Sequence, residues 1–125
     1  WVKLPLAQAA VLAPAACAAG AVGLVVGQPP AAAALRARPD GPPQPVNGAL
    51  YGPLVFPQML AALLQVAALQ LPAALIAGGG IHTGEQVRQC LAAGAQAVQI
   101  DSAVWVEPGL AGRLAADWDT TQPPA

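Results

Sequence analysis

The sequence predicts an α/β protein with a parallel sheet, and three observations lead to this fold class. Short apolar runs alternate along the chain with segments of helical character, which implies βαβ units. Two of the runs, Val22–Val26 and Ala73–Ala77, are almost continuously hydrophobic, as parallel strands covered on both faces are. The tetrapeptide AAGA recurs at residues 18–21 and 92–95, each time between a predicted helix and an apolar strand, and this indicates a repeating βα architecture.

Four strands and four helices follow from this reading. The predicted strands are Trp1–Leu4, Val22–Val26, Ala73–Ala77 and Ala97–Ile100. The predicted helices are Ala7–Ala19, Phe56–Leu69, Thr83–Ala93 and Leu110–Trp118. Four βα units are half of an eight-unit (β/α)8 barrel. We therefore expect a half-barrel domain at residues 1–116 and a Pro-rich tail at 117–125.

The helix expected at Thr83–Ala93 has the clearest local signals. Thr83 followed by Gln86 forms a capping box, in which the threonine oxygen accepts a backbone N–H and the glutamine reaches back to the N-cap. Glu85 in the first turn suits the helix dipole. Gly94 ends the helix, as glycine commonly does at the C′ position.

Residues 29–53 are rich in Pro and Gly and have little periodicity. The sequence predicts a long loop there, either functional or disordered.

The composition indicates a chain whose surface is partly covered. Hydrophobic residues make up 56% of the 125 residues and charged residues only 9%, against about 25% charged in ordinary soluble domains. The cover is either more polypeptide or a partner, and a second copy of the chain is one candidate.

Charge and cysteine content exclude several classes of function. The net charge is −1 and the five Lys and Arg are scattered, so a nucleic-acid groove or an anionic membrane surface is not expected. No apolar window reaches the about 18 residues of a transmembrane helix. Cys17 and Cys90 are too few for a disulfide framework and lack metal-ligand spacing, so no metal site is predicted. The low cysteine content also predicts a cytoplasmic location.

Three consecutive glycines, Gly78–Gly80, separate a predicted strand from the helix capped by Thr83. Without Cβ atoms the backbone can approach a ligand, and the N–H groups at a helix start favour an anion. A tight turn without a ligand is the alternative. The run matches neither G-x-G-x-x-G nor a P-loop. Ser102 follows the next strand, and the loops after strands seven and eight of a (β/α)8 barrel frequently bind phosphate together.

Several stretches resemble the dihydroorotate dehydrogenase family, in particular its soluble, FMN-containing branch. They are WVKLP, GLVVGQPP, GALYGP and AGGGIHTGEQVRQCLAAGAQAVQID, and together they span roughly residues 1–116. The glycine run with the following AGAQAVQI strand is the most specific part. The resemblance corresponds to the C-terminal half of that family's barrel.

This resemblance implies an FMN cofactor at the top of the barrel and specific roles for five residues. Lys3 would sit by the flavin and stabilise charge on its ring. Gly52 would lie against the FMN phosphate, and Gly79, Gly80 and Ser102 would donate to it. Independently, a lysine within an apolar strand needs an anionic or hydrogen-bonding partner, unless it reaches water from the strand end.

The implied reaction is the oxidation of dihydroorotate to orotate in pyrimidine biosynthesis, with proton loss to a base and hydride transfer to FMN. The family carries that base, a Cys or Ser, upstream of the segment matching WVKLP, and no residue precedes Trp1 in this sequence. Cys17 and Cys90 fall in predicted helices and are expected to be core residues. Whether the chain is itself an enzyme is therefore left open.

Other positions depart from the family. Gln28 stands near the place of the substrate-binding asparagines and is the candidate substrate contact. Asp101 replaces a usual glycine beside the phosphate and would repel it unless its side chain turned away or met a cation, for which Arg88 and Arg113 are weak candidates. His82 either touches ligand or is an exposed loop residue. Two alternatives to the enzyme remain: a non-catalytic structural subunit derived from such a barrel, and a barrel for another phosphate-bearing ligand.

Overall fold

The structure, a computed structural model, describes residues 1–121. Every predicted strand and helix is present, with bounds shifted by no more than three residues. The last helix continues to Thr121 and so includes the first residues of the predicted tail, whose boundary stays a prediction. The remainder of the predicted tail, 122–125, lies outside the described residues.

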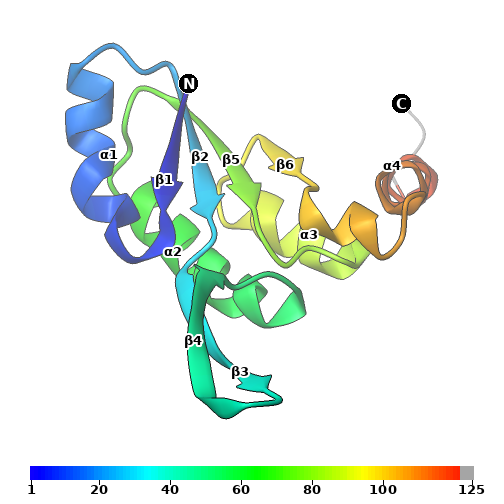
Figure 1. Ribbon diagram of the computed structural model, residues 1–125. Helices are drawn as coiled ribbons and strands as arrows, with labels where there is room; N and C mark the ends of the chain where they lie inside the picture. Colours follow the sequence, from blue (N-terminus) through cyan, green and yellow to red (C-terminus); the bar gives the residue numbers. More distant parts are fainter. Residues whose placement is uncertain (122–125) are drawn as a thin grey trace.

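Four parallel strands form the main sheet, in the order β1-β2-β5-β6. Their carboxyl ends point to the same edge of the sheet (Figure 1). The strands are β1 (Val2–Pro5), β2 (Gly23–Gln28), β5 (Ala74–Gly78) and β6 (Ala97–Gln99). The predicted fold class, α/β with parallel strands joined by helices, is confirmed.

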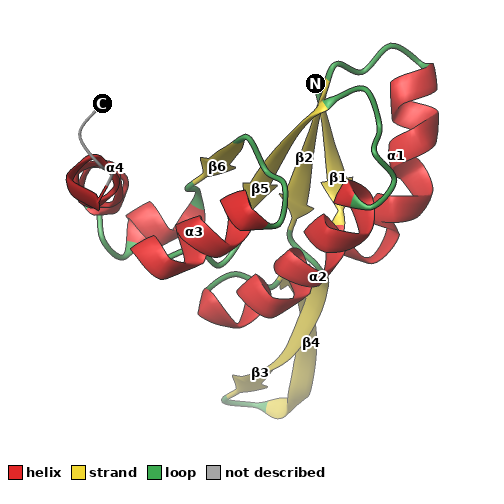
Figure 2. Cartoon of the chain, turned by 180° about the vertical axis from the view of Figure 1, so that it is seen from behind, coloured by secondary structure: helices red, strands yellow, loops and turns green. Residues whose placement is uncertain are grey.

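Helices cover one face of this sheet, as Figure 2 shows. The α-helices are α1 (Ala9–Ala18), α2 (Phe56–Ala67), α3 (Gly84–Ala92) and α4 (Leu110–Thr121). Short 3-10 turns are η1 (Leu6–Gln8), η2 (Pro53–Val55) and η3 (Ser102–Trp105). Over residues 1–121, none of the helices has the length and apolar character needed to cross a bilayer.

The core lies between the sheet and these helices. Leu4, Val26 and Ala77 are in register on neighbouring strands and are at most 1% exposed. From the helix side, Met59 and Leu63 of α2 are fully buried against them. This apolar layer is what the near-continuous hydrophobic strands require.

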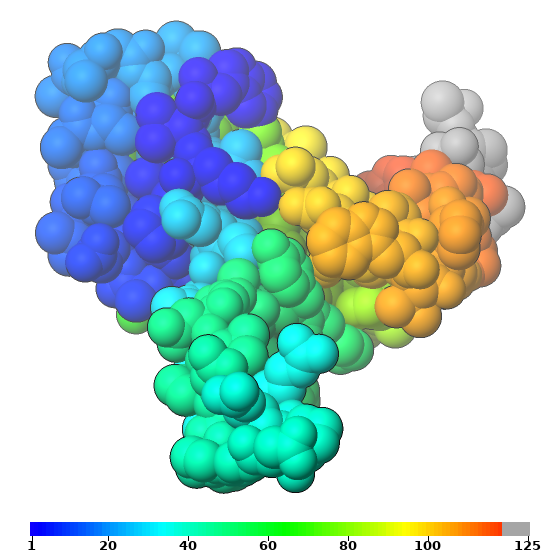
Figure 3. Space-filling view, in the orientation of Figure 1, coloured from blue at the N-terminus to red at the C-terminus, as the bar shows by residue number. Residues whose placement is uncertain are grey.

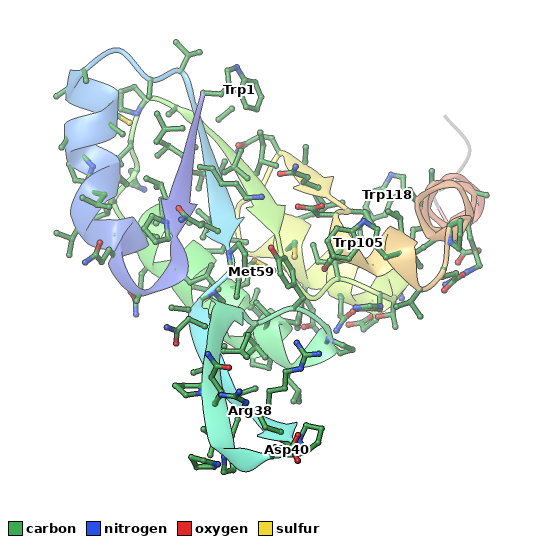
Figure 4. All side chains as sticks on the ribbon, in the orientation of Figure 1. Trp1, Arg38, Asp40, Met59, Trp105 and Trp118 are labelled. Atoms are coloured by element: carbon green, nitrogen blue, oxygen red, sulfur yellow. The ribbon has the colours of Figure 1, made fainter. Side chains whose placement is uncertain are left out.

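The opposite face of the sheet has no second layer within the described chain. Because side chains alternate along a strand, Lys3 and its register partner Val25 point away from the helices. Trp1 shares that face: a Cβ added at Gly23 would lie 2.8 Å from its indole ring, yet the Trp1 side chain is 73% exposed (Figure 4). In a closed barrel this face is the filled interior.

The prediction of a long loop at 29–53 was wrong. An antiparallel hairpin of β3 (Ala31–Arg38) and β4 (Gly41–Ala49) occupies most of it and projects as an arm from the carboxyl edge (Figure 3). Both strands are exposed almost throughout, so no apolar alternation marks them in the sequence. A two-stranded ribbon also leaves one edge of each strand free, which is where proline is tolerated.

Gly27→Ala is expected to lower the free energy of unfolding by about 1–3 kcal/mol, because an added Cβ would overlap the carbonyl oxygen of Gly78 on the neighbouring strand. Gly48→Ala is the matched control, since nothing lies within 4 Å of a Cβ at that strand position. Urea unfolding of both variants measures the difference. Equal stability of the two would show that β2 and β5 do not approach as described.

Candidate functional site

A pocket of about 350 Å³, including its open mouth, lies at the carboxyl edge of the sheet. Five of the six residues predicted for the site line it. They come from four segments: β1, the loop before η2, the turn after β5 and the start of η3. These residues are Lys3, Gly52, Gly79, Gly80 and Ser102. The topology thus brings together residues that are up to 99 positions apart (102 − 3).

Gln28 is not among the residues that line the pocket. It ends β2 and is exposed, while its neighbours Gly27 and Pro29 both contribute to the lining. The structure therefore does not bring Gln28 into the pocket, and its predicted contact with substrate stays a prediction.

The glycine turn after β5 is a tight turn that needs its glycines, and its role as an anion site stays a prediction. Gly79 and Gly80 have φ values of 121° and 71°, which L-residues rarely adopt. A Cβ at Gly80 would also overlap the backbone nitrogen of Phe56, so this glycine is needed for packing against the start of α2. At Gly79 the nearest atom to an added Cβ is a Val55 methyl carbon at 3.4 Å, so the constraint there is mainly the backbone angle.

Backbone N–H groups from the two loops remain available at the pocket. Within residues 1–121, the amides of Gly79, Gly80, Ser102 and Ala103 donate to no backbone acceptor. All four residues line a small hollow of about 200 Å³ between the turn after β5 and the loop after β6. Unpaired amides from successive loops are the groups that bind phosphate oxygens in proteins.

The predicted capping box is present and fixes the segment that follows the glycine turn. Thr83 Oγ1 accepts from the Gln86 N–H at 3.2 Å. Gln86 Oε1 in turn accepts from the backbone N–H groups of Thr83, at 3.1 Å, and His82, at 2.7 Å. His82 is half-buried, its backbone is held by this hydrogen bond, and it is not among the residues that line the pocket.

Asp101 meets a cation, but not one of those expected. Its carboxylate lies 3.6 Å from Lys3 Nζ. Arg88 instead pairs with Glu85 at 3.0 Å, and Arg113 pairs with Glu107 at 2.9 Å. The suggestion that Arg88 or Arg113 neutralises Asp101 was therefore wrong, because both arginines have closer carboxylates on or beside their own helices.

These two surface pairs also shift the ionisation of their carboxyl groups. The hydrogen bond from Arg88 holds the pKa of Glu85 below its usual value, with a smaller contribution from Gln89. The Arg113 hydrogen bond likewise lowers the pKa of Glu107, and it raises the pKa of Arg113 itself.

An aromatic pair beside the pocket was not predicted. The rings of Tyr51 and Trp105 lie 5.8 Å apart at 52°. Tyr51 lines the pocket, and the Trp105 side chain is 74% exposed on the same side of the molecule as the open sheet face (Figure 4). Nothing in the sequence links positions 51 and 105, since both lie outside the strands whose order can be predicted.

Neither cysteine belongs to the pocket. Cys17 is half-buried in α1 and Cys90 is fully buried in α3, as expected of core residues. Burial raises the pKa of the Cys90 thiol to about 11, which makes it a poor nucleophile at neutral pH.

A parallel sheet with βα connections and helices on one face is the architecture of part of a (β/α) barrel, which is the class of fold that this chain has. No family model matches the chain. Known proteins do match it, both in sequence and in fold.

The sequence is similar to catalytic subunits of dihydroorotate dehydrogenase B (NAD(+)) from three bacteria. The protein of Geobacter sulfurreducens is 44% identical over 75 residues, which are 59% of this chain and 24% of that protein. The Citrifermentans bemidjiense protein is 40% identical with the same coverage. The Desulforudis audaxviator protein is 44% identical over 58% of this chain and 23% of its own length. The match thus spans about a quarter of these curated relatives.

The fold is similar to a crystal structure of dihydroorotate dehydrogenase from Eimeria tenella in complex with ferulenol. The TM-score is 0.71 at 22% identity, over 94% of this chain and 32% of that one. At this identity the likeness establishes the fold alone. The predicted resemblance is confirmed in sequence over about 59% of this chain, and the fold agrees with it.

Thr83→Ala is expected to lower the free energy of unfolding by about 1 kcal/mol, since the Gln86 amide loses its acceptor at the start of α3. Thr83→Ser keeps the hydroxyl and should retain most of that stability. Thermal unfolding followed by circular dichroism compares the two. Equal losses for alanine and serine would mean that the methyl group, and not the cap, carries the effect.

Proposed function

We propose that this chain forms part of an FMN-dependent oxidoreductase of the dihydroorotate dehydrogenase type, and that its pocket binds the phosphate of FMN. The observation that carries the proposal is the convergence of five predicted residues on one pocket with unpaired amides at its wall. The relatives' names support the activity, which in this chain would be the oxidation of dihydroorotate to orotate in pyrimidine biosynthesis.

The backbone of the pocket suits a phosphate group, whereas one side chain, that of Asp101, does not. The turn at Gly79 and Gly80 presents main-chain atoms to the hollow between the loops, and Ser102 adds a hydroxyl at its edge. Asp101 lines the same hollow with a carboxylate. FMN, when bound, supplies the acceptor for a hydride.

The residues of the chain have separate roles in this proposal. Lys3 holds a positive charge on the open face of the sheet, where it can stabilise negative charge on a bound ring. Gly52 has a φ of 106° and its carbonyl accepts from Val55 at 3.1 Å, so the loop before η2 keeps a fixed shape beside the pocket. Gln28, exposed at the end of β2, is the candidate for holding substrate.

The open sheet face supports a further part of the proposal, a partner that completes the barrel. Strands β1 and β6 are the edges of the sheet, and the side chains of Trp1 and Lys3 lie on a face without a second layer. Unpaired edges of this kind ordinarily pair with other strands. Another polypeptide or a second copy of the chain would supply those strands, and the catalytic base would come from another polypeptide. A cytoplasmic location remains a prediction.

A second candidate is a non-catalytic accessory subunit derived from such a barrel. The specific observation in its favour is the Lys3–Asp101 pair, which puts a carboxylate where an anionic cofactor would bind. In that case the glycine turn would be retained for its packing against α2 alone.

Gly79→Glu is expected to weaken FMN binding at least a hundredfold, because a carboxylate would stand beside the unpaired amides and repel the phosphate. The control is Gly112→Glu, the same exchange at a glycine of α4 with open space around it. Titration followed by flavin fluorescence measures both affinities. Undiminished FMN affinity in Gly79→Glu would remove the turn from the site.

A further inference from the structure

The Lys3–Asp101 ion pair links the two edges of the sheet. Lys3 belongs to β1, and Asp101 follows β6 by two residues. Strands β2 and β5 lie between them, and in a flat sheet the edges would be about 14 Å apart. Both side chains therefore reach across the carboxyl edge, and their ion pair at 3.6 Å spans the pocket that they line.

The Asp101 carboxylate has a local alternative that it does not use. Asp101 is the N-cap residue of η3, where an aspartate ordinarily accepts a hydrogen bond from an amide of the first turn. No such side-chain cap is made. The carboxylate instead faces Lys3, and the amides of Ser102 and Ala103 keep no backbone acceptor within the described chain.

Lys3 is also the only lysine or arginine among the described residues that line the pocket. A phosphate monoester carries about two negative charges at neutral pH. In the hollow between the loops it would lie beside the charge of Asp101, which lines both that hollow and the pocket, whereas Lys3 lines the pocket only. Both partners are partly exposed, at 37% and 56%, so the pair can separate without burying a lone charge.

We infer that Asp101 is a specificity-determining residue of this pocket, a built-in anion that repels a ligand phosphate at the amides of the two loops. The inference rests on the proposed function, since it concerns the same pocket and the phosphate of the same cofactor. The Asp101 carboxylate lowers the affinity of the pocket for dianionic phosphate groups below the affinity that the glycine turn alone would give. It leaves ligands without a phosphate unaffected.

The experiment compares FMN with riboflavin, which has the same ring system and no phosphate. Both are titrated into the wild-type chain and into Asp101→Asn, with flavin fluorescence as the signal. Asp40→Asn is the matched control, because it removes the same charge at the far tip of the β3–β4 hairpin (Figure 4). Inorganic phosphate is titrated in parallel, with backbone amide shifts of Ser102 and Gly80 as the signal.

The expected result is an FMN affinity roughly tenfold higher in Asp101→Asn. The free energy that corresponds to this ratio is a modest fraction of the repulsion energy between two close charges. Riboflavin affinity should be unchanged in both variants, and Asp40→Asn should match the wild type. An FMN affinity equal to or below that of the wild type in Asp101→Asn would overturn the inference.

The proposed function can fail separately. If FMN binds to none of the proteins while inorganic phosphate binds more tightly to Asp101→Asn, the role of Asp101 stands and the FMN assignment is wrong. If neither FMN nor phosphate binds to any of them, both are overturned. An equal gain in affinity for riboflavin and FMN would show that Asp101 does not act on the phosphate group. It would overturn the role of Asp101 alone.

Discussion

The carboxyl edge of the sheet depends on direct contact of backbone with backbone. Gly27 of β2 lies so close to the Gly78 carbonyl of β5 that no side chain fits between them. Gly80 lies equally close to the start of α2: a Cβ added at Gly80 would be 2.9 Å from the Cα of Phe56. These contacts bring the loops together, and the unpaired amides of the pocket follow from the turn that the glycines allow.

The same architecture leaves one face of the sheet without a covering layer. On the side of the sheet that faces the helices, buried leucine and valine side chains form a well-packed core. Trp1 and Lys3 on the other side point into what is the interior of a closed barrel. This open face is the physical basis for proposing a partner.

Local signals in the sequence predicted the strands, the helices and the Thr83–Gln86 capping box, because each depends on residues close together in the chain. The five pocket residues were found through a family resemblance, and the fold then brought them together. The β3–β4 hairpin was missed because exposed strands carry no apolar period. The pairing of Asp101 with Lys3 was missed because it depends on how both side chains reach across the carboxyl edge, which no local pattern encodes.

The central claim is that the loops after β5 and β6 bind a phosphate group through their backbone amides. Amide spectra of the isotopically labelled chain, recorded with and without FMN, test it most directly. The account predicts that the signals of Gly79, Gly80 and Ser102 move while that of Gly112, on the exposed surface of α4, does not. Signals that stay fixed at the glycine turn, or that move only elsewhere, would contradict it.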